Sequence, residues 1–387
     1  MYFHLGIVLL FLIEKGLSST LTPQSDFDKS YVGVVYEPYT KNHDNRHDYT
    51  LDEVKDMLLV VSKRFKWIST YGMGTISATS KWNEGQAGGF SGMAASQINQ
   101  EMNSLQLVVN LGTWLISNDA VMKQEIVNAF TVAGLANSNF PGTVNGVIIT
   151  SHHTYTDDQL RTVVHLLSQN LATARNLKVQ LGLRTSNCDA LTRNSELIRL
   201  LDFINCQKFP TSQTSKSNVS AEVGLVGRYF LQLRQEFGTI KPNLTVIGET
   251  GWASFDKSGS QREYNSSVKF WREMGQWAKI NKFRVDMFTA FDEPWKIAIG
   301  THEPHYGWWE RVGNESSGSD AFREKLTYLE PEPAKPKSPW SVEVIEGRVI
   351  KDDTPPTSKN IASSPTILSE FVRFLLMITL YQKFVTL

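Results

Sequence analysis

The strongest candidate for a functional residue is a glutamate that follows a short apolar segment. Leu244–Ile247 reads as a buried strand, Gly248 follows it, and the next residue is Glu249, with Gly251 and Trp252 close behind. A charge at the exit of a buried strand is unfavourable unless it faces a polar cleft. Glu249 is therefore a candidate site residue, and the alternative is a solvated carboxylate in an ordinary turn.

Carboxylates and aromatic residues also follow other apolar segments of the chain. Sugars need hydrogen-bonding groups beside flat apolar faces, and aromatic rings supply such faces. If these segment ends meet in space, the sequence predicts a saccharide cleft around Glu249. The predicted substrate-binding residues are Tyr36, Tyr71, Trp114, Trp252, Glu293, Trp295 and Lys296. Core packing or a salt bridge is the alternative role for each of them.

The elements that would position these residues alternate along residues 31–330. Strands are predicted at Val32–Tyr36, Trp67–Tyr71, Leu107–Leu111, Gly146–Thr150, Val179–Leu183, Asp202–Cys206, Leu244–Ile247 and Val285–Phe291. Helices are predicted at Leu51–Arg64, Gln124–Ala136, Asp157–Asn176, Ala221–Phe237 and Gln261–Asn281. Eight strands alternating with helices indicate an α/β fold, the TIM (β/α)8 barrel, whose sites lie at the strand exits. A doubly wound sheet also alternates, but no Gly-rich phosphate loop follows the first strand.

Two motifs resemble those of glycoside hydrolase family 17, the endo-β-1,3-glucanases, and are most similar to the fungal cell-wall glucanase and glucanosyltransferase type. Residues 248–254 read GETGWAS and residues 290–296 read AFDEPWK, while GVVYEPY at 33–39 and LGTWL at 111–115 are weaker matches. The resemblance covers about residues 31–312. It implies a TIM barrel that cleaves β-glucan with retention, with Glu249 as the nucleophile.

The chain departs from the family at its acid/base residue. The resemblance places an Asn-Glu pair at the end of the fourth strand, and here Ser151 and His152 occupy those positions. Three interpretations stay open. His152 or His153 could act as the acid, because imidazolium titrates near pH 6.5. Glu37 or Glu293 could take that role, or the protein could be an inactive barrel that still binds a glycan.

Composition limits the partners of the chain. The 387 residues carry 39 basic and 39 acidic side chains, so no net charge favours nucleic acid as a partner. The histidines show no metal-ligand spacing, and no cofactor motif is present, so we expect neither a metal nor a cofactor. The only cysteines, Cys188 and Cys206, could form one disulfide or stay as two buried thiols.

Both ends of the chain indicate the secretory route. Residues 1–20 resemble a signal peptide, with an apolar run followed by small and polar residues. Residues 331–365 read as a Pro-rich polar linker, and residues 366–387 as an apolar tail that matches the outline of a lipid-anchor signal, a tail-anchoring helix being one alternative. Glycosylation sequons begin at Asn218, Asn243, Asn265 and Asn314.

These observations predict a secreted or surface-anchored glycoside hydrolase of the β-1,3-glucanase type. Its partner would be a polysaccharide or oligosaccharide, and its C-terminal tail could attach it to a membrane. The rival interpretation is a non-catalytic β-glucan-binding or glycan-binding surface protein on the same barrel. The Glu249 motif favours the enzyme, and the missing Asn-Glu pair favours the binding protein.

Overall fold

A computed structural model describes the central part of the chain. The described residues are 27–41, 49–84, 87–114, 118–149, 157–211, 213, 218–255, 261–298, 300, 302–312, 318 and 321–326. The predicted signal peptide, linker and C-terminal tail lie outside them, as do His152, His153 and Asn314. Among the described helices, none combines the length and apolar character needed to cross a bilayer.

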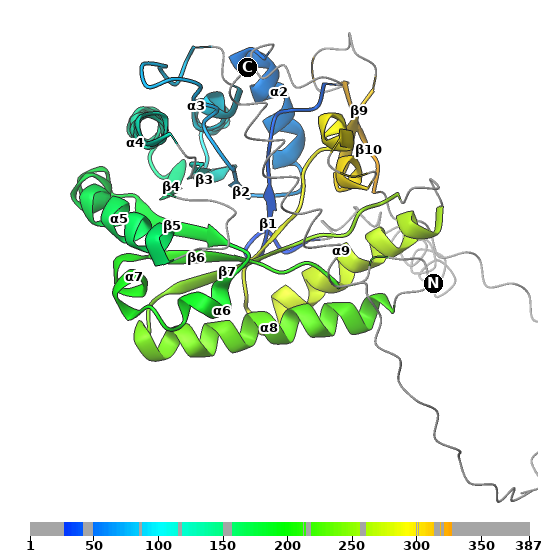
Figure 1. Ribbon diagram of the computed structural model, residues 1–387. Helices are drawn as coiled ribbons and strands as arrows, with labels where there is room; N and C mark the ends of the chain where they lie inside the picture. Colours follow the sequence, from blue (N-terminus) through cyan, green and yellow to red (C-terminus); the bar gives the residue numbers. More distant parts are fainter. Residues whose placement is uncertain are drawn as a thin grey trace, which may run out of the picture. The chain divides into compact units, whose positions relative to one another are not determined.

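Eight parallel strands close into a barrel in chain order (Figure 1). They are β1 (Val32–Val35), β2 (Trp67–Ser69), β3 (Val108–Gly112), β4 (Val144–Ile148), β5 (Gln180–Thr185), β6 (Phe203–Gln207), β7 (Thr245–Thr250) and β8 (Val285–Met287). The register that joins β8 to β1 closes the ring. The predicted TIM barrel is confirmed, and every predicted strand overlaps an observed one.

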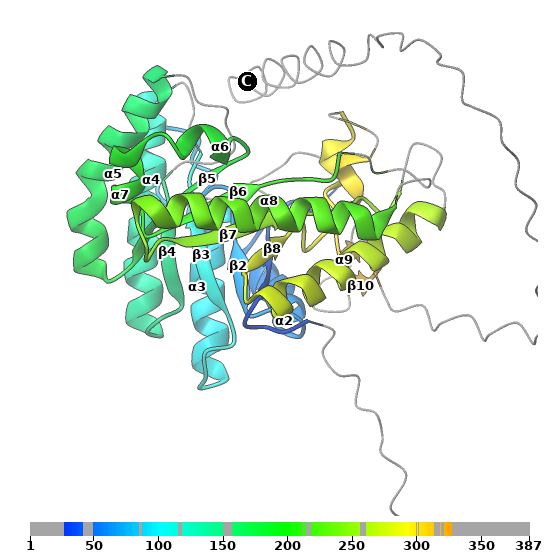
Figure 2. The same ribbon diagram turned by 90° about the horizontal axis from the view of Figure 1, so that it is seen from below.

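Helices surround the barrel on its outer side. They are α2 (Leu51–Ser62), α3 (Ala87–Glu101), α4 (Asp119–Asn139), α5 (Asp157–Leu177), α6 (Cys188–Leu191), α7 (Ser195–Leu200), α8 (Val219–Ile240) and α9 (Gln261–Asn281). The two long helices α8 and α9 run side by side in both views (Figures 1 and 2). Helix α8 packs against β7, and α9 packs against β1 and β8. Because all eight strands are parallel, their carboxyl ends meet at one mouth of the barrel.

Side-chain caps fix where several helices begin. Thr50 and Glu53 form a reciprocal capping box at the start of α2, with Thr50 accepting from the Glu53 amide and Glu53 accepting from the Thr50 amide. Asn118 and Asn218 accept from backbone amides at the starts of α4 and α8. Such caps satisfy donors that the first helical turn leaves without intrahelical partners.

After β8 the chain adds two 3-10 turns, η1 (Pro294–Ala298) and η2 (Glu303–His305), and a hairpin of β9 (Trp309–Arg311) and β10 (Phe322–Glu324). Asp292 ties this region together. Its Oδ1 accepts from the Gly307 amide at 2.8 Å and from Lys325 Nζ at 2.6 Å. Within the AFDEPWK motif, Asp292 therefore has a structural role.

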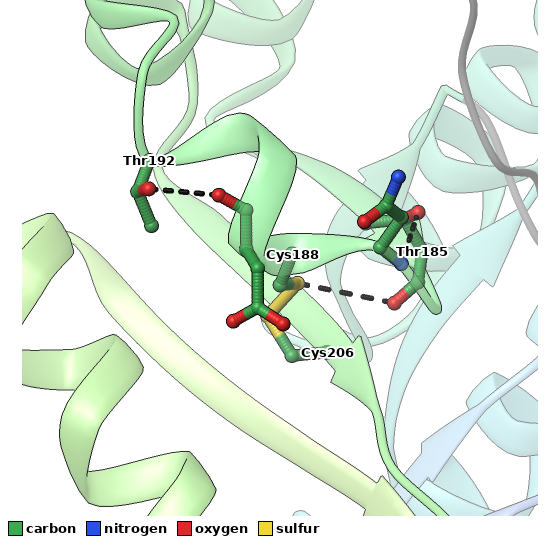
Figure 3. The surroundings of a disulfide bond; sticks show 6 residues. Thr185, Cys188, Thr192 and Cys206 are labelled. Atoms are coloured by element: carbon green, nitrogen blue, oxygen red, sulfur yellow. Dashed lines mark hydrogen bonds between the residues drawn. A yellow bond between two sulfur atoms is a disulfide. The ribbon is translucent and has the colours of Figure 1, made fainter.

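A disulfide joins the first residue of α6 to β6. Cys188 and Cys206 are both fully buried, with an S–S distance of 2.01 Å and a Cα–Cα distance of 5.8 Å (Figure 3). Closing a loop of this size stabilises a fold by about 3 kcal/mol. The bridge fixes the chain just after β5, where it leaves the barrel mouth.

Candidate active site

Glu249 lies inside the barrel at the carboxyl end of β7. The structure extends β7 past the predicted end at Ile247, because Glu249 pairs in register with Gln207 on β6 and Asp286 on β8. Its side chain is fully buried, so the alternative of a solvated turn residue is wrong. A buried carboxylate needs charge balance and hydrogen-bond donors, and both are present here.

Three side chains bind the carboxylate of Glu249. Its Oε1 accepts from the Tyr71 hydroxyl at 2.6 Å and from Gln207 Nε2 at 2.7 Å, and its Oε2 lies 2.9 Å from Arg184 Nε. An ionised carboxylate is an acceptor only, whereas a protonated one would have to direct its own proton at one of these donors. The surroundings therefore fit the anion.

Arg184 reaches Glu249 from β5 across the interior of the barrel. Its Nη1 donates to the Thr70 carbonyl at 2.7 Å, and its Nη2 donates to the Ser69 hydroxyl. The guanidinium also lies 4.3 Å from the centre of the Tyr71 ring. Both Nη groups thus have an acceptor, Nε lies at ion-pair distance from Glu249, and the planar face rests on an aromatic ring.

Tyr71 links this charged centre to the rim. Burial, and then the negative charge of Glu249, raise the pKa of Tyr71 well above its ordinary value, so the phenol stays protonated and can donate. Its backbone amide donates to Glu37 at 2.8 Å, and its ring stacks on Trp114 at 5.4 Å between centroids. A Cβ on Gly72 would lie 2.2 Å from the Trp114 ring, so glycine is required there.

A second charged pair occupies the rim after β8. Glu293 Oε2 lies 2.6 Å from Lys296 Nζ, and Lys296 also lies 4.8 Å from the ring centre of Phe288. Burial raises the pKa of Glu293 against the opposing effect of Lys296. Burial alone would lower the pKa of Lys296, but Glu293 outweighs it and the pKa is raised. Trp295 is partly buried beside them, with its ring centre 5.4 Å from Lys296 Nζ.

Two predicted sugar-binding residues point away from the mouth. The Tyr36 hydroxyl meets Met57 of α2 at 3.8 Å, and Trp252 packs on Phe270 of α9 at 5.5 Å between centroids. Both side chains are fully buried. Successive side chains of a strand point to opposite faces, and these two fall on the helix side. The prediction that Tyr36 and Trp252 bind substrate is therefore wrong.

The carboxylates near Glu249 already have structural contacts. Glu37 accepts from the Tyr71 amide, Glu293 pairs with Lys296, and Asp292 holds the region before the hairpin. Asp286 lies deeper in the barrel, where burial raises its pKa and Arg284 opposes the shift. Among the described residues, no cluster of His, Cys, Asp and Glu is arranged to hold a metal ion.

Sequence reasoning missed Arg184 and Gln207 as site residues. Arg184 is the one charged residue in the strand segment QLGLRT. The sequence signal for Arg184 was its place directly after the predicted strand Val179–Leu183, because a charge at the exit of a buried strand needs a polar partner. That partner, Glu249, lies 65 residues further along the chain.

Three of the predicted glycosylation asparagines can be placed. Asn218 caps α8 through its side-chain oxygen, Asn243 precedes β7, and Asn265 lies on α9, and all three are exposed. The Asn218 cap uses Oδ1, which leaves the amide nitrogen available for a glycan. The three positions belong to the α8–β7–α9 part of the molecule (Figure 2).

Solved structures with a similar fold include two β-1,3-glucanosyltransferase structures and an endo-laminarinase. An active-site mutant of a β-1,3-glucanosyltransferase from Rhizomucor miehei, in complex with laminaritriose, is 17% identical, with 72% of this chain and 92% of that chain covered and a TM-score of 0.52. A family 17 β-1,3-glucanosyltransferase structure from the same organism is 16% identical, with 77% and 97% covered and a TM-score of 0.53. An endo-laminarinase from Formosa is 15% identical, with 73% and 84% covered and a TM-score of 0.55.

No family model and no curated protein matches the sequence. At these identities the structural likeness shows the fold and leaves the activity to be established by experiment. The chain has a TIM-barrel fold, as these solved structures do.

Proposed function

We propose that this protein is a β-glucan-directed, retaining glycoside hydrolase-type barrel that keeps its nucleophile but lacks the carboxylic acid of the usual pair. The observation that carries the proposal is the anchoring of Glu249 by Arg184, Tyr71 and Gln207 at the carboxyl end of β7. Retaining enzymes place an ionised carboxylate in such a position, where it can attack the anomeric carbon.

The proposed step is a substitution at the anomeric carbon. A Glu249 oxygen forms a bond to that carbon, the bond to the leaving oxygen breaks, and the electron pair leaves with that oxygen, which then takes a proton. Water later releases the sugar from the ester. Both steps need proton transfer, and His152 is the positional candidate for it because it occupies the place of the family's acid.

Activated aryl glucosides test the nucleophile separately from the acid. A dinitrophenolate leaving group needs no proton, so 2,4-dinitrophenyl β-laminaribioside should react with Glu249 even without an efficient acid. Azide should then accelerate turnover by roughly 10²-fold, because it attacks the ester without a general base. The measurements are dinitrophenolate absorbance and identification of the β-glycosyl azide.

The matched control is the double variant Glu249→Gln with Arg184→Met, which removes the nucleophile together with its buried counter-charge. Dinitrophenolate release that is equal in the wild type and this control would sink the proposal. Release of an α-glycosyl azide would contradict the retaining mechanism.

The second candidate function is glycan binding without catalysis. The full burial of Glu249 and the structural contacts of Glu37, Asp292 and Glu293 favour it. Trp114, which is partly exposed and stacks on the buried Tyr71 ring, would then be the main sugar-binding face. Retardation of the protein in a laminarin-containing gel, without dinitrophenolate release, would establish this function in place of the first.

We also propose that the protein follows the secretory route and carries N-linked glycans. The Cys188–Cys206 disulfide supports an oxidising compartment, and exposure of the sequon asparagines supports modification. After expression in a secretory eukaryotic host, we expect glycans on Asn218, Asn243 and Asn265. Peptide mapping after peptide-N-glycosidase digestion measures this as Asn-to-Asp conversion, and unmodified asparagine at all three positions would contradict it.

We also propose that residues 366–387 attach the protein to the cell surface.

A further inference from the structure

Arg184 contacts both the reacting group and the aromatic face of the candidate site. It starts on β5, pairs with Glu249 on β7, and donates to Ser69 and Thr70 at the end of β2. Its guanidinium lies against the Tyr71 ring at 4.3 Å. Tyr71 in turn donates to Glu249 and stacks on Trp114. One fully buried side chain thus connects three strands of the barrel.

These contacts use the shape of the guanidinium as well as its charge. Two nitrogens donate to two different acceptors, the third lies 2.9 Å from Glu249 Oε2, and the flat face covers an aromatic ring. A lysine ammonium could balance the charge of Glu249 but could not make this set of directed contacts or lie flat on Tyr71. Geometry and charge can therefore be separated by experiment at this position.

We propose that Arg184 is a positioning residue that fixes the Glu249 carboxylate and the Tyr71–Trp114 stacking face relative to each other. The part that concerns reactivity rests on the proposed function. Glu249 must point at the anomeric carbon of a sugar whose ring is held by the aromatic face, and a misplacement of about 1 Å costs on the order of 10² in rate. A rotation of the guanidinium would displace both parts together, because Tyr71 touches Arg184, Glu249 and Trp114.

The experiment compares Arg184→Lys with Arg175→Lys. Arg175 forms a bidentate pair with Asp202 on the outside of the barrel, at 2.7 and 2.9 Å, so its variant makes the same change away from the site. We expect Arg184→Lys to lower azide-supported dinitrophenolate release by about 10²-fold. We expect its laminarin affinity, measured by gel retardation, to fall about two- to fivefold, as loss of a cation–π contact implies. Arg175→Lys should change neither.

Tyr71→Phe provides a second variant that keeps the ring. It retains the contact with Arg184 and the stack on Trp114 but loses the hydroxyl that donates to Glu249. We expect a lower rate of dinitrophenolate release with unchanged laminarin affinity. If Arg184→Lys does not fold, this split between rate and affinity decides the question, and equal loss of both or of neither overturns the inference.

Two failures can be told apart. Equal rates and equal laminarin affinities for the wild type and Arg184→Lys would overturn the positioning role alone. A wild type that shows neither dinitrophenolate release nor retardation would overturn the proposed function, and this inference with it. A barrel that binds laminarin without reacting leaves affinity as the deciding measurement for Arg184.

Discussion

Replacing Glu249 by Gln is expected to lower the free energy of unfolding by about 3–5 kcal/mol, which is large for a change at a site residue. The reason is that Arg184 would lose its counter-charge. Arg184 is fully buried and pairs with Glu249 at 2.9 Å, so the variant strands a guanidinium charge inside the barrel. Urea unfolding followed by far-UV circular dichroism measures the difference.

A double-mutant cycle isolates the pair from the single residue. Adding Arg184→Met to Glu249→Gln removes the stranded charge, so the double variant should recover at least about 2 kcal/mol of the loss. Glu310→Gln is the control, because its partner Arg323 is exposed and such surface pairs contribute about 1 kcal/mol or less. Additive losses in the cycle would show that Arg184 and Glu249 are not coupled.

Introducing the acid that the resemblance to family 17 implies should produce the largest gain in activity. The double change Ser151→Asn with His152→Glu places the Asn-Glu pair where the resemblance expects it. Because general acid–base catalysis contributes about 10²–10⁴-fold, laminarin hydrolysis should rise by a factor in that range. The rate of glycosyl-enzyme formation from the dinitrophenyl substrate should change little, since its leaving group needs no proton. Reducing-sugar release and the dinitrophenolate burst measure the two effects.

Two controls define the position of the acid. His153→Glu moves the carboxylate by one residue and should give no comparable gain. His152→Ala tests the imidazole itself, and a fall in laminarin hydrolysis with an unchanged dinitrophenolate burst would identify His152 as the working acid. If the double change leaves laminarin hydrolysis at the wild-type rate, the missing pair does not limit the reaction, and the binding function becomes the better account.

The glycine-rich segment that became α3 shows how packing can override local preference. Ala87–Glu101 contains three glycines in its first six residues, and intrinsic preference disfavours a helix there. The structure needs those glycines because a Cβ on Gly88 or Gly89 would lie 2.4 or 2.3 Å from a backbone oxygen, and one on Gly92 would lie 2.6 Å from Val132. Close approach of the helix to its neighbours, which no local pattern reveals, decides this element.

The sequence by itself determined the alternation of strands and helices, and hence the barrel, because apolar periodicity and turn residues are local properties. It also located Glu249, Tyr71, Trp114, Glu293, Trp295 and Lys296 at strand exits. Only the tertiary structure decided which of these side chains enter the barrel. The direction of each side chain follows from strand register, and register depends on pairing with distant segments.

The same dependence explains Arg184, Tyr36 and Trp252. Arg184 is a site residue because it pairs with Glu249, and the two side chains meet only when β5 and β7 belong to the same closed barrel. Tyr36 and Trp252 have the residue types of a sugar-binding site, but the register turns them toward α2 and α9. The local sequence therefore supplied the candidate residues. The closed barrel decided which of them share one buried centre, because that requires contacts between segments far apart in the chain.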